Sequence, residues 1–131
     1  MRILHIVGSI DPRAGGVSEA IRALLTHGPS GYQQEVVSMD DPAASFLAEI
    51  PVPTHAFGPA KSAFAYTPQL KPWLLANRSR FDAIFVHGLW GYGGLATLRA
   101  CAGRIPYVVF PHGMLDPYFK KQYPLKHLKK A

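Results

Sequence analysis

The chain of 131 residues alternates short apolar segments with amphipathic ones. A short apolar run bounded by turn residues is typical of a buried strand, because a strand covered on both faces has few polar positions. The run at the start of the chain, which Gly8 ends, is of this kind. Five segments predict strands: Ile3–Val7, Gln34–Ser38 around its two valines, Val52–Phe57 although Pro53 interrupts it, Ala83–Val86 and Tyr107–Phe110.

Helices are predicted between these strands. Apolar residues that recur every three or four positions form one face of a helix, and a proline inside a helix is tolerated only in the first turn. A glycine followed by a proline is typical of a helix end, and Asp followed by Pro of a helix start. The signals are Val17, Ala20, Ile21, Leu24 and Leu25 before Gly28-Pro29; Pro72 within residues 61–80; Leu95, Leu98 and Ala102 on one face; and Asp116-Pro117.

Strands that alternate with helices, and that are apolar on both sides, predict a parallel sheet with helices on both faces. The length of 131 residues suits one domain with a substantial core. We therefore expect a single Rossmann-like α/β domain over residues 1–131. The segment after Pro117 is not followed by a strand that would return to the sheet, which favours the front part of a longer protein.

Composition narrows the class of protein. Apolar residues make up 48% of the chain and charged residues 17%, as in a globular domain. No apolar run is long enough to span a membrane, and the apolar stretch at the start is too short for a secretory signal. The single cysteine, Cys101, excludes an internal disulfide and a multi-cysteine zinc site, and we expect it to be a small buried residue. A cytoplasmic protein is predicted.

The positive charge is concentrated at one end of the chain. The net charge is +6, and residues 117–131 hold five lysines and no acidic residue. A nucleic-acid-binding domain would spread its basic residues over a folded face, so we expect no nucleic-acid partner. The lysine-rich end is either a solvated surface or a peripheral contact with the anionic inner face of the cell membrane, with Leu125 and Leu128 as its apolar side.

Three glycine-containing loops follow predicted strands: residues 8–16, 87–94 and 111–116. In open parallel sheets, ligands bind beyond the carboxyl ends of the strands, so these loops are the candidate site. Gly15 and Gly16 precede a helix, where backbone N–H groups and the helix dipole favour a phosphate. The alternative is a tight turn without a ligand. The loop matches neither the dinucleotide-binding fingerprint nor the P-loop.

Histidines begin the other two loops. His87 and His112 could each bond a substrate hydroxyl, act in proton transfer, or only bond the backbone or cap a helix. Trp90 and Tyr92 could stack on a sugar or cover the sheet. His5 lies inside a strand and is expected to be a hydrogen-bonded core residue. The sequence holds neither H-E-x-x-H nor D-x-D, so no metal site is predicted.

Three segments together resemble the N-terminal domain of family 4 glycosyltransferases, retaining enzymes of the GT-B fold. They are the start of the chain through the loop up to Val17, the segment His87-Gly88-Leu89-Trp90, and the segment from Pro111 to Pro117. The resemblance covers nearly the whole chain. It implies that the domain is the N-terminal half of a GT-B fold.

The resemblance also implies an activity and a set of site residues. The activity is transfer of a sugar, of the hexosyltransferase type, from a nucleotide-sugar to a saccharide or lipid-linked acceptor with retention of configuration and without a bound metal or cofactor. The C-terminal domain that carries most donor contacts is absent, so we expect residues 1–131 alone to be inactive. A stand-alone module that binds an anionic sugar or nucleotide is the alternative. The implied residues are His112 at the reacting centre; Gly15 and Gly16 at the donor phosphate; and His87, Trp90, Tyr92, Met114 and Asp116 at the acceptor.

Overall fold

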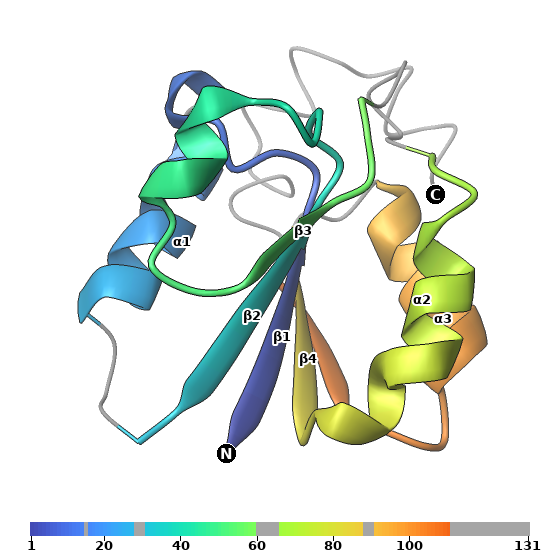
Figure 1. Cartoon of the computed structure of the whole chain (residues 1–131). Helices are drawn as coiled ribbons and strands as arrows, with labels where there is room; N and C mark the ends of the chain where they lie inside the picture. The colour runs from blue at the N-terminus through green and yellow to red at the C-terminus, as the bar shows by residue number, and fades with distance from the viewer. Residues whose placement is uncertain (15, 28–30, 60–65, 88–90, 111–131) are drawn as a thin grey trace, which may run out of the picture.

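The computed structural model describes residues 1–14, 16–27, 31–59, 66–87 and 91–110, and in these ranges it shows a single parallel sheet in the order β3-β2-β1-β4-β5 (Figure 1). The strands are β1 (Arg2–Val7), β2 (Gln33–Ser38), β3 (Thr54–Ala56), β4 (Ala83–His87) and β5 (Tyr107–Phe110). The helices are α1 (Gly16–His27), α2 (Leu70–Asn77) and α3 (Tyr92–Cys101), with short 3₁₀ helices η1 (Pro12–Ala14), η2 (Ser45–Glu49) and η3 (Arg78–Arg80). The predicted Rossmann-like α/β fold is confirmed.

Helices cover both faces of the sheet, α1 on one face and α2 with α3 on the other (Figure 1). Successive residues of a strand point to opposite faces, so each strand contributes to two cores. In β1, Leu4 and Ile6 belong to the core that α2 and α3 cover, whereas Val7 packs in the core that includes Ile21 and Leu25 of α1. The chain runs from β1 to β2 and β3 on one side of β1, and then returns to β4 on the other side of β1. Right-handed crossovers in these two opposite directions place their helices on opposite faces of the sheet.

The strand predictions hold, although β1, β2 and β4 are each one residue longer than predicted and β3 is shorter. All five predicted segments contain a strand, but β3 is confined to Thr54–Ala56 rather than extending over residues 52–57. Proline has no N–H to donate, and the carbonyl of Pro53 still accepts the amide of Val36 at 2.9 Å. The Pro72 prediction is confirmed, since Pro72 is the third residue of α2.

The helix faces differ from the predicted ones. In α3, Leu98 is 49% exposed and Ala102 lies beyond the end of the helix. After Tyr92 in its first turn, the side that is buried instead consists of small residues, Ala96, Thr97, Ala100 and Cys101. Where the helix lies this close to the sheet, small side chains fit best, and apolar spacing alone does not reveal such contacts. The buried apolar face of α1 is also narrower than predicted, because Leu24 is 38% exposed.

The two glycines in the first turn of α3 allow a direct test of this close packing. A Cβ at Gly93 would lie 2.8 Å from Cγ2 of Ile6, whereas a Cβ at Gly94 would lie 3.9 Å from Cγ1 of Val86. We expect Gly93→Ala to lower the free energy of unfolding by about 1–3 kcal/mol through overpacking. Gly94→Ala should leave it unchanged or raise it by up to about 1 kcal/mol, because alanine favours helix.

Urea denaturation of both variants measures this difference. Equal effects of the two substitutions would show that α3 does not approach β1 as closely as the structure indicates.

Candidate functional site

The three candidate loops follow strands that are neighbours in the sheet. Strands β1, β4 and β5 are adjacent and parallel, so their carboxyl ends lie at one edge. The chain leaves β1 toward β2 and later continues from β4 toward β5, so the strand order reverses between β1 and β4. In open α/β sheets, ligands bind at this switch point. The structure therefore places at one edge the strand ends that these loops follow, whereas residues 111–116 themselves lie outside the described residues.

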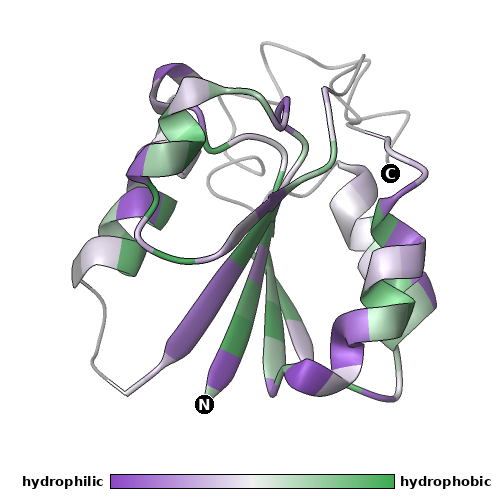
Figure 2. Cartoon of the chain, in the orientation of Figure 1, coloured by the Kyte–Doolittle hydropathy of each residue, from purple (hydrophilic) through white to green (hydrophobic). Residues whose placement is uncertain are grey.

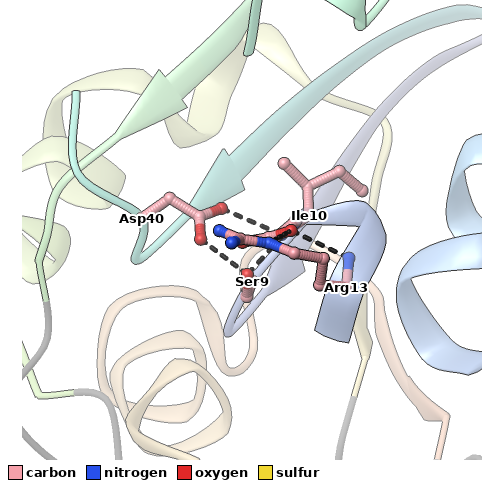
Figure 3. Close-up of polar contacts among 5 residues, drawn as sticks. Ser9, Ile10, Arg13 and Asp40 are labelled. Carbon is pink, nitrogen blue, oxygen red and sulfur yellow. Dashed lines mark hydrogen bonds and ion pairs between the residues drawn. The ribbon is translucent and has the colours of Figure 1, made fainter. Parts of the chain in front are cut away.

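Asp40, which lies two residues beyond the end of β2, holds the loop after β1. Ser9 Oγ donates to Asp40 Oδ1 at 2.6 Å, and the amide of Ile10 donates to Asp40 Oδ2 at 2.9 Å (Figure 3). The amide of Met39 donates to the Gly8 carbonyl at 3.2 Å. A carboxylate that accepts two such bonds holds the loop more firmly than neutral partners would. Asp40 was not singled out from the sequence, because only the strand pairing places it beside residues about thirty positions earlier.

The same loop carries an ion pair before the start of α1. Asp11 Oδ1 accepts the amide of Arg13 at 2.8 Å, and Asp11 Oδ2 accepts Arg13 Nη2 at 2.9 Å. The side-chain hydrogen bond from Arg13 holds the pKa of Asp11 below its usual range. Gly16 is the first residue of α1, so the helix begins one residue earlier than in the prediction, which places both glycines before it. Gly15 lies outside the described residues.

His87 is the last residue of β4 and is 8% exposed. Its Nε2 lies 2.9 Å from Nδ1 of His5. Its ring lies between two others: the centroid of His5 is 5.1 Å away at an interplanar angle of 29°, and that of Phe110 is 5.3 Å away at 13°. The candidate acceptor residue is therefore held between side chains of the two neighbouring strands, β1 and β5.

His5 is a buried, hydrogen-bonded residue as predicted, but it also supports a candidate site residue. It is fully buried, and its Nε2 lies 2.7 Å from Gln34 Oε1 of β2. Burial lowers the pKa of His5 more than the bond to Gln34 raises it. The contact with His87 could not be found from the sequence, because it depends on the register that pairs Val7 with His87 across some eighty residues.

Tyr92 is placed apart from His87. It begins α3, is 7% exposed and packs in the core between the sheet and α2 with α3. Its ring contacts Tyr66 edge-on at 4.7 Å, and Tyr66 is 55% exposed. Tyr66 lines a hollow of about 490 Å³ together with Phe57, Thr67 and Gln69. The predicted residues Trp90, His112, Met114 and Asp116 lie outside the described residues.

A second polar cluster lies away from the strand ends. Glu35 in the first half of β2, which Figure 2 shows as hydrophilic, accepts His55 Nε2 at 2.9 Å and Arg80 Nη2 at 2.6 Å. Burial would raise the pKa of Glu35, but these two bonds outweigh it and lower the pKa. The cluster joins β2, β3 and η3, so its role is to hold the sheet together.

Cys101 is fully buried, and burial raises the pKa of its thiol, so it is a core residue as predicted. In the parts of the chain that the structure describes, no group of three or more His, Cys, Asp or Glu side chains could hold a metal ion. Within those same ranges, no helix is both long and apolar enough to cross a bilayer.

The bonds of Asp40 can be tested at the amide of Ile10. We expect Asp40→Ala to increase the hydrogen-exchange rate of this amide by roughly tenfold to a hundredfold, because a bond to a charged group contributes about 1.5–3 kcal/mol. Asp41→Ala is the matched control, since Asp41 accepts the amide of Ala43 within its own turn. An unchanged rate in Asp40→Ala would show that Asp40 does not hold the loop.

Comparison with known proteins relates this geometry to a family. The profile of the glycosyl transferase 4-like domain matches residues 15–130, which is most of the chain. Neither the curated proteins nor the solved structures contain a match to it. The matched range includes the loops after β4 and β5 and the start of α1. The chain therefore belongs to the glycosyl transferase 4-like domain family.

Proposed function

We propose that the chain is the N-terminal, acceptor-side domain of a retaining glycosyltransferase of the hexosyltransferase type. The observation that carries the proposal is the placement of three glycine-containing loops at adjacent strand ends, at the switch point of the sheet, in a member of this family. The donor is a nucleotide-sugar, and the acceptor is a saccharide or a lipid-linked saccharide.

The donor diphosphate is proposed to bind at the start of α1, beside Gly15 and Gly16. The backbone N–H groups of a first helical turn favour an anion. Ser18 in this turn supports the proposal, because it is 1% exposed and its hydroxyl has no hydrogen-bond partner among the described residues. A buried hydroxyl without a partner is unfavourable, and an incoming phosphate oxygen could satisfy it.

The acceptor is proposed to bind across the loops after β4 and β5, at His87, Trp90, Tyr92, Met114 and Asp116. Tyr66 adds an aromatic ring to this region, since it is exposed, contacts Tyr92 and lines the neighbouring hollow. Aromatic rings and side-chain amides are suited to a sugar, which presents both apolar C–H faces and hydroxyls. Tyr92 itself is nearly buried, so its contribution would come mainly through the position of Tyr66.

His112 is proposed to act at the reacting centre, where it stabilises the charge that develops between the sugar and the departing diphosphate. Stabilisation of this charge requires groups on both sides of a closed cleft. The second side is proposed to come from a C-terminal domain, and the reaction to need no bound metal. The lysine-rich residues 117–131 are proposed to contact an anionic membrane where lipid-linked acceptors reside.

Replacement of His112 tests its role. In the longer protein that includes the donor-binding domain, we expect His112→Ala to lower kcat by roughly a hundredfold or more, because the lost group acts in the transition state. His27→Ala is the control, since His27 ends α1 and so lies at the other end of the helix from the proposed phosphate site. Product formation from a panel of nucleotide-sugars measures both, and unchanged turnover in His112→Ala would remove His112 from the mechanism.

The proposal that sugar transfer requires two domains gives a second test. We expect residues 1–131 alone to transfer no sugar, because one side of the cleft is missing. Sugar transfer by this segment would contradict the two-domain proposal. Tight binding of a sugar or nucleotide by the segment, with no transfer by any longer form, would instead favour a stand-alone binding module.

A further inference from the structure

We propose that Gln34 and His5 are positioning residues that determine which ring nitrogen of His87 carries the proton. The three side chains form one chain of hydrogen bonds from β2 through β1 to β4, on the sheet face that α1 partly covers. This chain crosses the sheet where the strand order reverses. Its consequence for acceptor binding rests on the proposed function, whereas the protonation pattern itself does not.

The direction of the bonds follows from the chemistry of their atoms. Gln34 Oε1, 2.7 Å from His5 Nε2, can only accept, so His5 Nε2 must carry a hydrogen. A neutral imidazole has one N–H, and Nδ1 of His5 is then an acceptor. Nε2 of His87, 2.9 Å from it, must therefore donate. An amide on β2 thus determines the tautomer of a histidine two strands away.

His5 is suited to remain neutral and to keep this direction. It is fully buried, and its ring packs edge-on against Phe85 with centroids 5.5 Å apart. The acidic residue next to Gln34, Glu35, occupies the opposite face of the sheet, where its carboxylate bonds His55 and Arg80. Burial of the ring away from this carboxylate disfavours a second proton on His5.

The rings on either side of His87 hold its imidazole in one orientation, so that each ring nitrogen faces a defined direction. The ring lies between those of His5 and Phe110, at interplanar angles of 29° and 13°. Rotation of the ring would break the bond to His5 and disturb the contact with Phe110 together. With Nε2 donating, Nδ1 of the neutral ring is an acceptor, so any group that bonds it must be a donor. Under the proposed function, the acceptor sugar binds beside this ring, whose protonation state is already set.

The protonation pattern can be measured without any ligand. In the chain labelled with ¹⁵N-histidine, multiple-bond ¹H–¹⁵N spectra at pH 7.5 distinguish the nitrogen that carries the hydrogen. We expect His5 and His87 both to be the Nε2–H tautomer, with assignments from His5→Asn and His87→Asn. A wild-type His87 with its hydrogen on Nδ1 would overturn the proposal.

The role of Gln34 is tested by removing its acceptor oxygen. Gln34→Met keeps the length of the side chain but leaves His5 without a preferred tautomer, so the two ¹⁵N shifts of His87 should move toward each other. Gln33→Met is the matched control, because Gln33 is the exposed neighbour on the same strand. Unchanged His87 shifts in folded Gln34→Met, or equal changes in both variants, would show that Gln34 does not determine the tautomer.

A kinetic measurement separates this proposal from the proposed function. In the longer protein, Gln34→Met should raise KM for the acceptor several-fold and leave KM for the donor unchanged. An unchanged acceptor KM would overturn the link between the tautomer and acceptor binding. Absence of transfer with any nucleotide-sugar, in the wild type as well, would refute the proposed function while the spectra still decide the protonation pattern.

Discussion

The pairing of β1 with β2 on one side and with β4 on the other is the constraint on which the rest of the structure depends. Its register runs from Arg2 with Gln33 to Val7 with Ser38, and on the other side it ends with Val7 beside His87. Because both pairings are parallel, the chain must cross the sheet between them, and right-handed connections place α1 on one face and α2 with α3 on the other. The same pairings bring the loops after β1 and β4 to one edge.

The polar side chains of Gln34 and Glu35 are accommodated within the sheet because each finds a partner on a neighbouring strand. A buried polar group without a hydrogen bond is destabilising, and the polar side chains on the two faces of β2 therefore each have a hydrogen-bond partner on their own face. Gln34 bonds His5 on one face, and Glu35 bonds His55 and Arg80 on the other. These bonds also restrict the register, since a shift of one residue would exchange the two faces and leave both groups unpaired.

The two best-described parts of the candidate site are held in the same manner, each by a residue from a neighbouring strand or its end. Asp40, just beyond β2, accepts bonds from the loop after β1, and His5 in β1 contacts His87 at the end of β4. Of the described site residues, His87 is therefore positioned by the sheet itself, and the loop after β1 is held by a residue just beyond a neighbouring strand. A residue in a regular element is held more precisely than one in a loop.

The sequence by itself determined the class of fold, most strand positions, the family resemblance and the loops that form the candidate site. These features are local, since apolar periodicity and glycine before a helix are visible within about ten residues. Only the tertiary structure decided which side chains meet: His5 with His87, Asp40 with Ser9, and the small residues of α3 against the sheet. The reason is that strand register and helix approach are set by packing between segments far apart in the chain, and each segment alone is compatible with several such pairings.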